Sequence, residues 1–195
     1  MRAPGVIGSW AAGMLFTVVL SGCASPGTRV SGAGDPVREL DAWAASGRLG
    51  VAARGQGGSG SFLWEQAGEQ SVIRLSGPVG IGGVEIEVDA ADLRVATSDG
   101  QVFESDAAHR ELAARLGADV PTSSLRYWLL GLAAPGPHQW TSTSDGRRVL
   151  AQDGWRIEYG DFTRTGRTEL PTRLTATAGD TRVRLVIDRW DLARQ

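Results

Sequence analysis

The chain contains 195 residues with a formal net charge of −2 at pH 7, so its bulk charge does not favour a nucleic-acid partner. The sequence has no lysine, which excludes a P-loop nucleotide site and Schiff-base catalysis. Its only cysteine is Cys23, so an intramolecular disulfide is excluded as well.

The first 22 residues have the features of a secretory signal peptide. Arg2 supplies a short positive start, and no charge follows between Ala3 and Gly22. The segment ends in small residues, and the resulting "LSGC" matches a bacterial lipobox. We therefore expect cleavage before Cys23 and attachment of acyl chains to its sulfur.

Two other interpretations of residues 1–22 stay open. About 20 uncharged residues can span a bilayer, so the segment can be a transmembrane anchor, although its glycines and serines make it a weak span. It can also be an ordinary cleaved signal followed by an incidental cysteine. Lipidation explains the only thiol of the chain, since the sulfur of Cys23 would be the attachment point of the lipid. Two or more acyl chains there would give long-lived membrane attachment.

The residues after the cysteine predict the location and layout of the mature protein. Neither Ala24 nor Ser25 is acidic, whereas an aspartate at this position retains lipoproteins at the inner membrane in bacteria that sort by it. The sequence therefore favours lipid anchoring to the periplasmic face of the outer membrane. Residues 23–36 are rich in Gly, Ser and Pro and predict a flexible tether. Residues 37–195 then suit a single domain.

A helix is predicted at the start of this domain, over residues 36–46. Asp35 can cap it, Pro36 suits the first helical position, and Val37 and Leu40 fall on one face. We therefore expect a short amphipathic helix before the first strand.

Short segments of alternating apolar and polar residues follow. The clearest runs from Val84 to Val88, where apolar side chains alternate with Glu85 and Glu87. This alternation is typical of an antiparallel sheet with one buried and one solvated face. Asp99–Gly100 predicts the turn of a hairpin. The strands and the hairpin are expected at 47–54, 60–66, 71–76, 83–89 and 93–104.

The spacing of apolar residues along the chain then changes from that of strands to that of helices. Asp106 and Gly117 mark the start and stop of one predicted helix, and a second is expected over residues 121–132. Strands are expected again at 147–152, 155–160, 172–178 and 181–188. This order predicts a mainly β fold, either a strongly curved antiparallel sheet or a barrel, with a helical insertion against its mouth.

No residue pattern indicates an enzyme. His109 in a predicted helix and His138 in a predicted loop lack a neighbouring nucleophile or orienting acid, so both are expected to be idle. Glu85 and Glu87 resemble paired carboxylates, but the solvated face of a strand explains them better. No metal motif is present, and the only non-protein group expected is the covalent lipid on Cys23.

The apolar interior has two interpretations. Large side chains can fill an ordinary core, or they can line a barrel lumen that stays open for an apolar ligand. The sequence alone favours neither. The tryptophans beyond the predicted signal are Trp43, Trp64, Trp128, Trp140, Trp155 and Trp190.

An apolar loop separates two of the predicted strands. It contains Pro78, Val79, Gly80 and Ile81 and carries no charge, whereas loop tips are normally polar. Two interpretations stay open. The loop can fold back onto the core, or it can touch a membrane or an apolar partner.

Several stretches between Trp43 and Leu192 form a recognisable series. They are, in order, W-x4-R from Trp43 to Arg48, "SGSFLWEQ", "LSGPVGIGGVEIEV", "LRYWLLGLAAPG", "QDGWRIEYGDF", "LPTRL" and "VRLVIDRWDL". The combination of P-x-G after a strand, Y-W-L-x-G and G-W-x-x-x-Y is more specific than any one of these motifs. Together the stretches resemble the LolB family of outer-membrane lipoprotein receptors. The resemblance implies an incomplete antiparallel β-barrel covered by a helical lid, with a hydrophobic cavity between them.

The resemblance also implies a function without catalysis. Proteins of this family accept lipoproteins from the soluble periplasmic carrier LolA and place them in the outer membrane. The implied partners are a LolA-like carrier, cargo lipoproteins and outer-membrane lipid, and we expect a monomer. The protruding apolar residue of the family's loop falls on Val79, which implies that Pro78–Ile81 inserts into the membrane, with Ile81 assisting.

We expect apolar strand faces and the second predicted helix to line the implied cavity and hold acyl chains. Exposing about 14 CH₂ groups to water would cost about 11 kcal/mol, so a carrier must hide each chain. Two other functions stay open: a lipid- or small-ligand-binding lipoprotein without a handover partner, and a structural envelope lipoprotein with a filled core. The candidate cavity residues are Leu49, Val51, Phe62, Trp64, Ile73, Leu75, Val84, Ile86, Trp128, Leu129, Trp155 and Ile157.

Overall fold

The domain is built mainly from short strands, with helices between the sixth and the seventh. The computed structural model describes residues 36–77, 83–89, 92–116, 119 and 121–192. Its strands and helices are, in chain order, β1 (Ala42–Ala53), β2 (Gln56–Ala67), β3 (Gln70–Ser76), β4 (Val84–Val88), β5 (Leu93–Thr97), β6 (Val102–Glu104), α1 (Ser105–Leu116), α2 (Thr122–Leu129), β7 (His138–Ser142), β8 (Arg148–Gln152), β9 (Trp155–Tyr159), β10 (Phe162–Thr165), β11 (Thr168–Pro171), β12 (Arg173–Ala178) and β13 (Thr181–Leu192).

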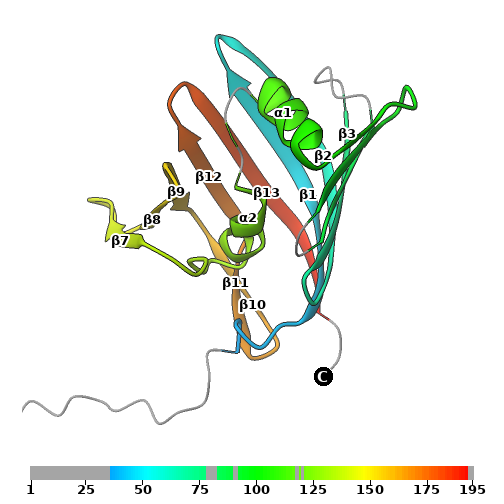
Figure 1. Ribbon diagram of the computed structural model, residues 1–195. Coiled ribbons are helices and arrows are strands. Elements are labelled where there is room, and N and C mark those ends of the chain that lie inside the picture. The colour runs from blue at the N-terminus through cyan, green and yellow to red at the C-terminus, as the bar shows by residue number, and fades with distance from the viewer. Residues whose placement is uncertain (1–35, 78–82, 90–91, 117–118, 120, 193–195) are drawn as a thin grey trace, which may run out of the picture. The chain divides into compact units, whose positions relative to one another are not determined.

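Eleven of these strands form one antiparallel sheet (Figure 1). Their order is β6-β5-β4-β3-β2-β1-β13-β12-β9-β8-β7, and β10 and β11 form a separate hairpin. The edge strands β6 and β7 are not paired with each other, so the sheet is unclosed. The predicted fold class, an incomplete antiparallel barrel with a helical insertion, is confirmed.

The first and the last strand of the domain lie side by side in the middle of the sheet. β1 and β13 pair over almost their whole length, with a register shift between Ser46 and Gly47. A Cβ atom on Gly47 would lie 2.1 Å from the carbonyl oxygen of Val186, so no side chain fits at this position. Glycine therefore allows the close approach of the two strands that join both ends of the domain.

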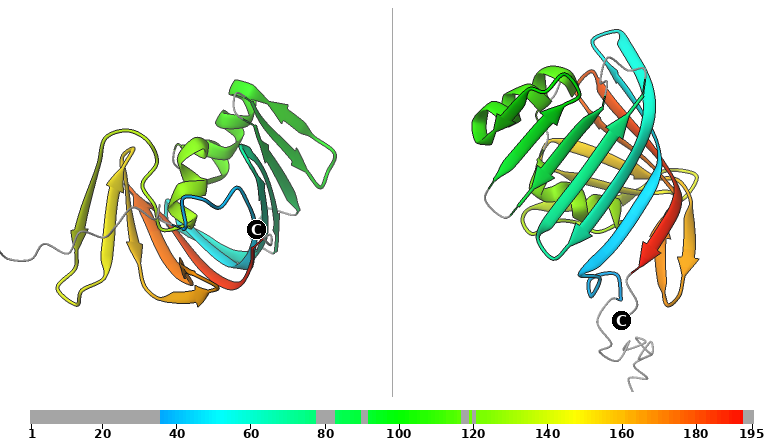
Figure 2. Two further views of the ribbon diagram at one scale, coloured as in Figure 1. Left: turned by 90° about the horizontal axis from the view of Figure 1, so that it is seen from below. Right: turned by 90° about the vertical axis from the view of Figure 1, so that its right-hand side faces the viewer.

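Both helices lie on the concave side of the curved sheet (Figure 2). Each strand directs alternate side chains toward this side. α1 contributes the buried residues Ala108 and Leu112, and α2 contributes Trp128 and Leu129. The core consequently lies between the helices and the sheet.

Two predictions about local structure are wrong. Residues 36–39 form a turn instead of a helix, and β1 begins at Ala42 and takes up the last five residues of the predicted helical segment. β1 pairs with β2 on one side and with β13 on the other, and this tertiary pairing outweighs the local helical pattern. His138 is the first residue of β7 and does not lie in a loop.

Candidate functional site

A cavity of about 140 Å³ lies between the concave face of the sheet and the helices. Its wall comes from seven strands of the large sheet, from Leu112 of α1 and from four residues of α2. Apart from the indole N–H groups of Trp64, Trp128 and Trp155, Thr122 carries the one polar side-chain group among the described lining residues. The cavity therefore suits an apolar ligand and offers no partner for a charged one.

Cross-strand rows of apolar side chains form the floor of the cavity. One row joins Val51, Val183, Ala176 and Ile157 through direct register pairs across β1, β13, β12 and β9. Because paired residues in neighbouring strands point to the same face, alternation in each strand adds up to one continuous apolar surface.

Most of the cavity residues predicted from the sequence meet in this wall. Val84 is the exception, since it is buried at 2 % exposure but does not line the cavity. The predicted residues that do line it are Leu49, Val51, Phe62, Trp64, Ile73, Leu75, Ile86, Trp128, Leu129, Trp155 and Ile157.

Several lining residues were missed in the sequence, although a signal for most of them was available. Leu174 and Ala176 alternate with polar residues in β12, as Val183 and Leu185 do in β13. The complete set of missed lining residues is Val88, Leu112, Thr122, Leu125, Leu174, Ala176, Val183 and Leu185.

The tryptophans divide between the cavity wall and the packing behind it. Trp64, Trp128 and Trp155 line the cavity. Trp43 packs against Trp64 at 5.6 Å between ring centroids, outside the lining. The apolar interior thus contains both a cavity and a packed core, and each includes some of the tryptophans.

Buried hydrogen bonds attach α2 to strands β8 and β9. The side-chain amide of Gln152 accepts a hydrogen bond from the indole Nε1 of Trp128 at 3.0 Å. The same amide accepts from the backbone N–H of Ala134 and donates to its carbonyl, at 3.0 and 2.9 Å. Ser124 donates to Asp153 at 2.6 Å. These contacts fix the helix and the chain after it against one half of the sheet.

Tyr159 adds a further bond to this attachment. Its hydroxyl donates to the carbonyl oxygen of Trp128 at 2.9 Å, and its side chain is fully buried. Burial raises the pKa of Tyr159 strongly, while the nearby Arg148 acts in the opposite direction. The phenol is therefore protonated at neutral pH, as its role as a donor requires.

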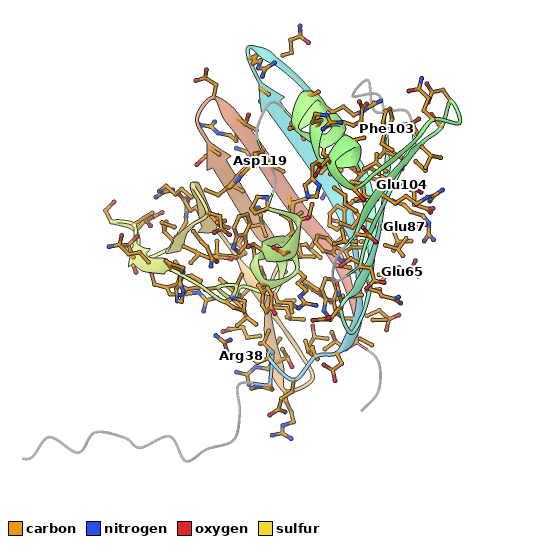
Figure 3. The ribbon with its side chains drawn as sticks, in the orientation of Figure 1. Arg38, Glu65, Glu87, Phe103, Glu104 and Asp119 are labelled. Carbon is orange, nitrogen blue, oxygen red and sulfur yellow. The ribbon has the colours of Figure 1, made fainter. Side chains whose placement is uncertain are left out.

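The charged residues considered for catalysis have structural roles in the described chain. Glu85 pairs with Arg74 at 2.8 Å, and Glu87 pairs with Arg94 at 3.2 Å. Figure 3 shows Glu87, with Glu65 of β2, on the side of the sheet away from α2. These strands thus have the solvated face that the sequence predicts.

Neither histidine joins a catalytic arrangement in the described residues. His109 lies in α1 with its Nδ1 3.0 Å from the carbonyl oxygen of Ser105, and His138 contacts the carbonyl of Gly136 at 2.9 Å. The described residues also contain no group of three or more acidic, histidine or cysteine side chains placed to hold a metal ion. No helix in the same residues is long and apolar enough to cross a membrane.

Two groups of predicted site residues lie outside the described residues. They are the lipidation site Cys23 and the loop residues Pro78, Val79, Gly80 and Ile81. Their roles therefore stay predictions.

Comparisons with known proteins agree with the pattern of motifs. The family model described as "Outer membrane lipoprotein LolB" matches residues 41–190. An outer-membrane lipoprotein LolB from Alkalilimnicola ehrlichii is 36% identical over 189 residues, which covers 92% of this chain and 94% of that protein. The protein of the same name from Pseudomonas fluorescens is 33% identical and covers 90% of this chain and 92% of its own length.

A solved structure shows the same type of fold at low sequence similarity. The crystal structure of a DUF1329 family protein from Desulfovibrio piger aligns with a TM-score of 0.56 at 9% identity. The alignment covers 81% of this chain and 88% of that one. At this identity the likeness concerns the fold alone.

Proposed function

Because the chain belongs to the LolB family of outer-membrane lipoproteins, we propose that it accepts lipoproteins from a periplasmic LolA-like carrier and inserts them into the outer membrane. The family consists of non-enzymatic lipoprotein receptors, so the prediction that the protein is not an enzyme is confirmed. In the proposed cycle the cavity holds the acyl chains of the cargo between acceptance and release.

The apolar lining of the cavity is the observation that supports this proposal. Each CH₂ group moved from water into an apolar site contributes about 0.8 kcal/mol, and no charged side chain lines the described wall to oppose it. Three tryptophans give the wall a large apolar area. An acyl chain is the ligand class that uses such a surface along its whole length.

The size of the cavity sets a condition on how it is loaded. At about 140 Å³ it is close to the engineered cavity of about 150 Å³ that takes up benzene. A chain of about 14 CH₂ groups is much larger than benzene. We therefore expect α1 or α2 to move away from the sheet when cargo enters.

Two elements outside the described residues complete the proposal. Acyl chains on Cys23 would hold the protein on the outer membrane, and the loop Pro78–Ile81 would touch the bilayer during release. Entry of Val79 and Ile81 into the membrane contributes about 1.5–3 kcal/mol for each side chain. This is too little to anchor the protein, but it is enough to direct a loaded complex toward the bilayer.

The direction of transfer needs no nucleotide. Each tenfold increase in affinity corresponds to about 1.4 kcal/mol, so a modest gradient from carrier to receptor to bilayer suffices. The absence of lysine, and with it of a P-loop, agrees with a transfer driven by affinity alone.

The test is a two-step transfer assay with a labelled acylated lipoprotein, first from carrier to this protein and then from this protein to liposomes. Ala176→Leu adds three carbon atoms to the cavity wall and should reduce acceptance from the carrier at least fivefold while the domain stays folded. Ala151→Leu is the matched control, because Ala151 is an exposed residue of β8 outside the lining. Equal acceptance by both variants would contradict the cavity as the acyl-chain site.

The wild-type protein decides between the proposed receptor and a simple binder. A receptor takes up cargo only with delivery from the carrier and then passes it to liposomes. Binding of free lipid without any uptake from the carrier would instead indicate a lipid-binding lipoprotein.

A variant of the loop tests its role in the second step of the assay, the transfer from this protein to liposomes. Val79→Glu should slow release into liposomes and leave acceptance from the carrier unchanged. Release at the wild-type rate would exclude the loop from membrane insertion.

A further inference from the structure

Arg148, the first residue of β8, is packed among aromatic rings. The guanidinium carbon of Arg148 lies 4.3 Å from the ring centroid of Phe162. It lies 5.7 Å from the centroids of both Trp140 and Tyr159. The rings themselves form a row, with Trp140 stacked on Tyr159 at 5.9 Å and Tyr159 tilted toward Phe162 at 6.0 Å. We call these four residues the Arg148 cluster.

The chain after α2 also confines this guanidinium. Gly131 has a φ of +78°, and a Cβ atom there would lie 3.2 Å from an Nη atom of Arg148 and 3.1 Å from the ring of Pro171. The side chain of Arg148 is therefore held in place on several sides, although the residue is exposed to solvent.

Arg148 differs from its neighbours in having no carboxylate partner within the described chain. Arg147 and Arg156 share Glu158, at 2.9 and 3.0 Å, and Arg173 pairs with Asp161 at 3.0 Å. The contacts of Arg148 are with aromatic rings, which accept no ordinary hydrogen bonds from its N–H groups. Its donors are consequently available to an acceptor from outside the domain.

Such a guanidinium is well prepared to bind a carboxylate. Stacking on rings immobilises the planar group and lowers the entropy that binding would otherwise cost. Arginine forms bidentate, charge-assisted bonds with carboxylates. Exposed tryptophan, tyrosine and arginine are also the residue types that dominate the binding energy of protein interfaces. Trp140, which is 39 % exposed, places such a side chain beside the cation.

The neighbouring strand indicates the form of the partner. β7 is the edge of the sheet, and all five of its residues, "HQWTS", are exposed. It contains no proline and no acidic or arginine side chain, although proline and charged residues usually protect an edge from pairing. A free edge of this kind can receive an extended segment of another protein as an added strand.

We propose that β7 and the Arg148 cluster dock the carrier protein through an extended segment that bears a carboxylate. The inference rests on the proposed function, because that function requires a protein donor. Backbone pairing along β7 would give the segment its register, and Arg148 would select an acidic residue within it. None of the four residues of the cluster lines the cavity, so docking there leaves the cavity residues free for cargo.

The experiment measures binding of purified, empty carrier to the full-length acylated protein in phosphatidylethanolamine nanodiscs. Arg148→Gln keeps a polar, unbranched side chain but removes the charge and the guanidinium, and it should raise the Kd at least tenfold. Arg148→Lys should fall between this variant and the wild type, because it retains the charge without the bidentate geometry. Arg156→Gln, on the opposite face of the neighbouring strand β9, is the matched control and should stay within twofold of the wild type. Thermal unfolding of each variant checks that the domain is intact.

The outcomes separate this inference from the function on which it rests. If the carrier delivers cargo to the wild type and binds Arg148→Gln equally well, the docking inference is wrong and the function stands. If the carrier neither binds nor delivers cargo to the wild type, both are wrong. If the effect of Arg148→Gln appears only when phosphatidylglycerol is added to the nanodiscs, Arg148 binds a lipid headgroup, and the docking inference is again overturned.

Discussion

The two helices cover the same face of the sheet, but different interactions hold them there. α2 is attached by buried hydrogen bonds to Gln152 and Tyr159 and by the contact between Ser124 and Asp153. α1 is held mainly by burial of Ala108 and Leu112, and its Arg115–Glu111 pair lies within the helix itself.

This difference predicts which part of the lid moves. Apolar packing has no preferred direction, so α1 can shift at the cost of the buried area alone. Movement of α2 would leave several buried polar groups without partners, at about 1–3 kcal/mol for each group. We therefore expect α1 to open for cargo and α2 to stay with β8 and β9.

Truncation of one leucine in each helix tests this difference between α1 and α2, and it is the prediction with the largest expected effect. Leu129 in α2 and Leu112 in α1 both line the cavity, with exposures of 2 % and 5 %. Leu129→Ala should lower the free energy of unfolding by about 2–5 kcal/mol, as expected for a cavity created in a fixed core. Leu112→Ala should lower it by less than half as much, because α1 can relax into the space. Urea denaturation measures both values.

Hydrogen exchange provides the control for this pair of variants. In the wild type, backbone amides of α1 should exchange through local opening at a lower free energy than those of α2. Leu112→Ala should accelerate exchange in α1 only. Equal protection of α1 and α2 would show that the two helices open as one unit, which would contradict the expected difference between them.

Loss of the central hydrogen-bonding side chain should have the next largest effect. Gln152→Ala leaves the Trp128 indole N–H and both backbone groups of Ala134 without their buried partner. The free energy of unfolding should fall by about 2–4 kcal/mol. Gln139→Ala on β7 is the matched control and should change it by less than about 0.5 kcal/mol, since Gln139 is exposed. A small effect of Gln152→Ala would mean that packing alone holds α2.

The sequence predicted most strands of the sheet, but it did not predict the edge strand β7, and it assigned a helix to the first segment. Strands such as β4 were recognisable because one face is buried and the other solvated, which leaves an alternating pattern. The turn at Asp99–Gly100 was recognisable because Gly100 tolerates the left-handed backbone that the structure has there. β7 was not predicted because all of its residues are exposed, so its sequence shows no alternation of apolar and polar side chains.

The cavity wall was predictable strand by strand, but its boundary was not. Alternation shows that Val84 and Ile86 face the same side of β4, and both are buried. Which of them reaches the cavity depends on where the helices cross the sheet, and that position is set by long-range contacts such as Trp128 with Gln152. Local sequence patterns contain no information on such a crossing point.

A smaller effect is expected from the hydroxyl of Tyr159. Tyr159→Phe removes the bond to the carbonyl of Trp128 and should cost about 0.5–1.5 kcal/mol at pH 7. The raised pKa of Tyr159 also predicts a pH dependence. The unfolded chain ionises this group near pH 10 while the folded protein keeps it protonated, so stability is complete below pH 10 and declines above it.

The alkaline decline should be absent from Tyr159→Phe. Its slope in the wild type is about 1.4 kcal/mol per pH unit between the unfolded and the folded pKa. Since the chain has no lysine, no lysine titration overlaps with this range. Parallel pH profiles of the free energy of unfolding for wild type and variant would contradict the burial of an ionisable phenol beneath α2.

The smallest effect is expected from the ion pairs on the outer side of β9. Glu158 accepts hydrogen bonds from Arg156 and Arg147, and these lower the pKa of its carboxyl. The stabilisation is therefore present above the ordinary pKa of 4.5 and is lost as the pH falls through the lowered value. Glu158→Gln should cost no more than about 1 kcal/mol at pH 7, and 1 M salt should bring the wild type close to the variant. Urea unfolding at both salt concentrations measures the difference. If Glu158→Gln lowered the free energy of unfolding by more than about 2 kcal/mol even in 1 M salt, these exposed ion pairs would stabilise the fold as much as the buried hydrogen bonds of α2. Buried hydrogen bonds would then no longer explain why α2 stays in place while α1 moves.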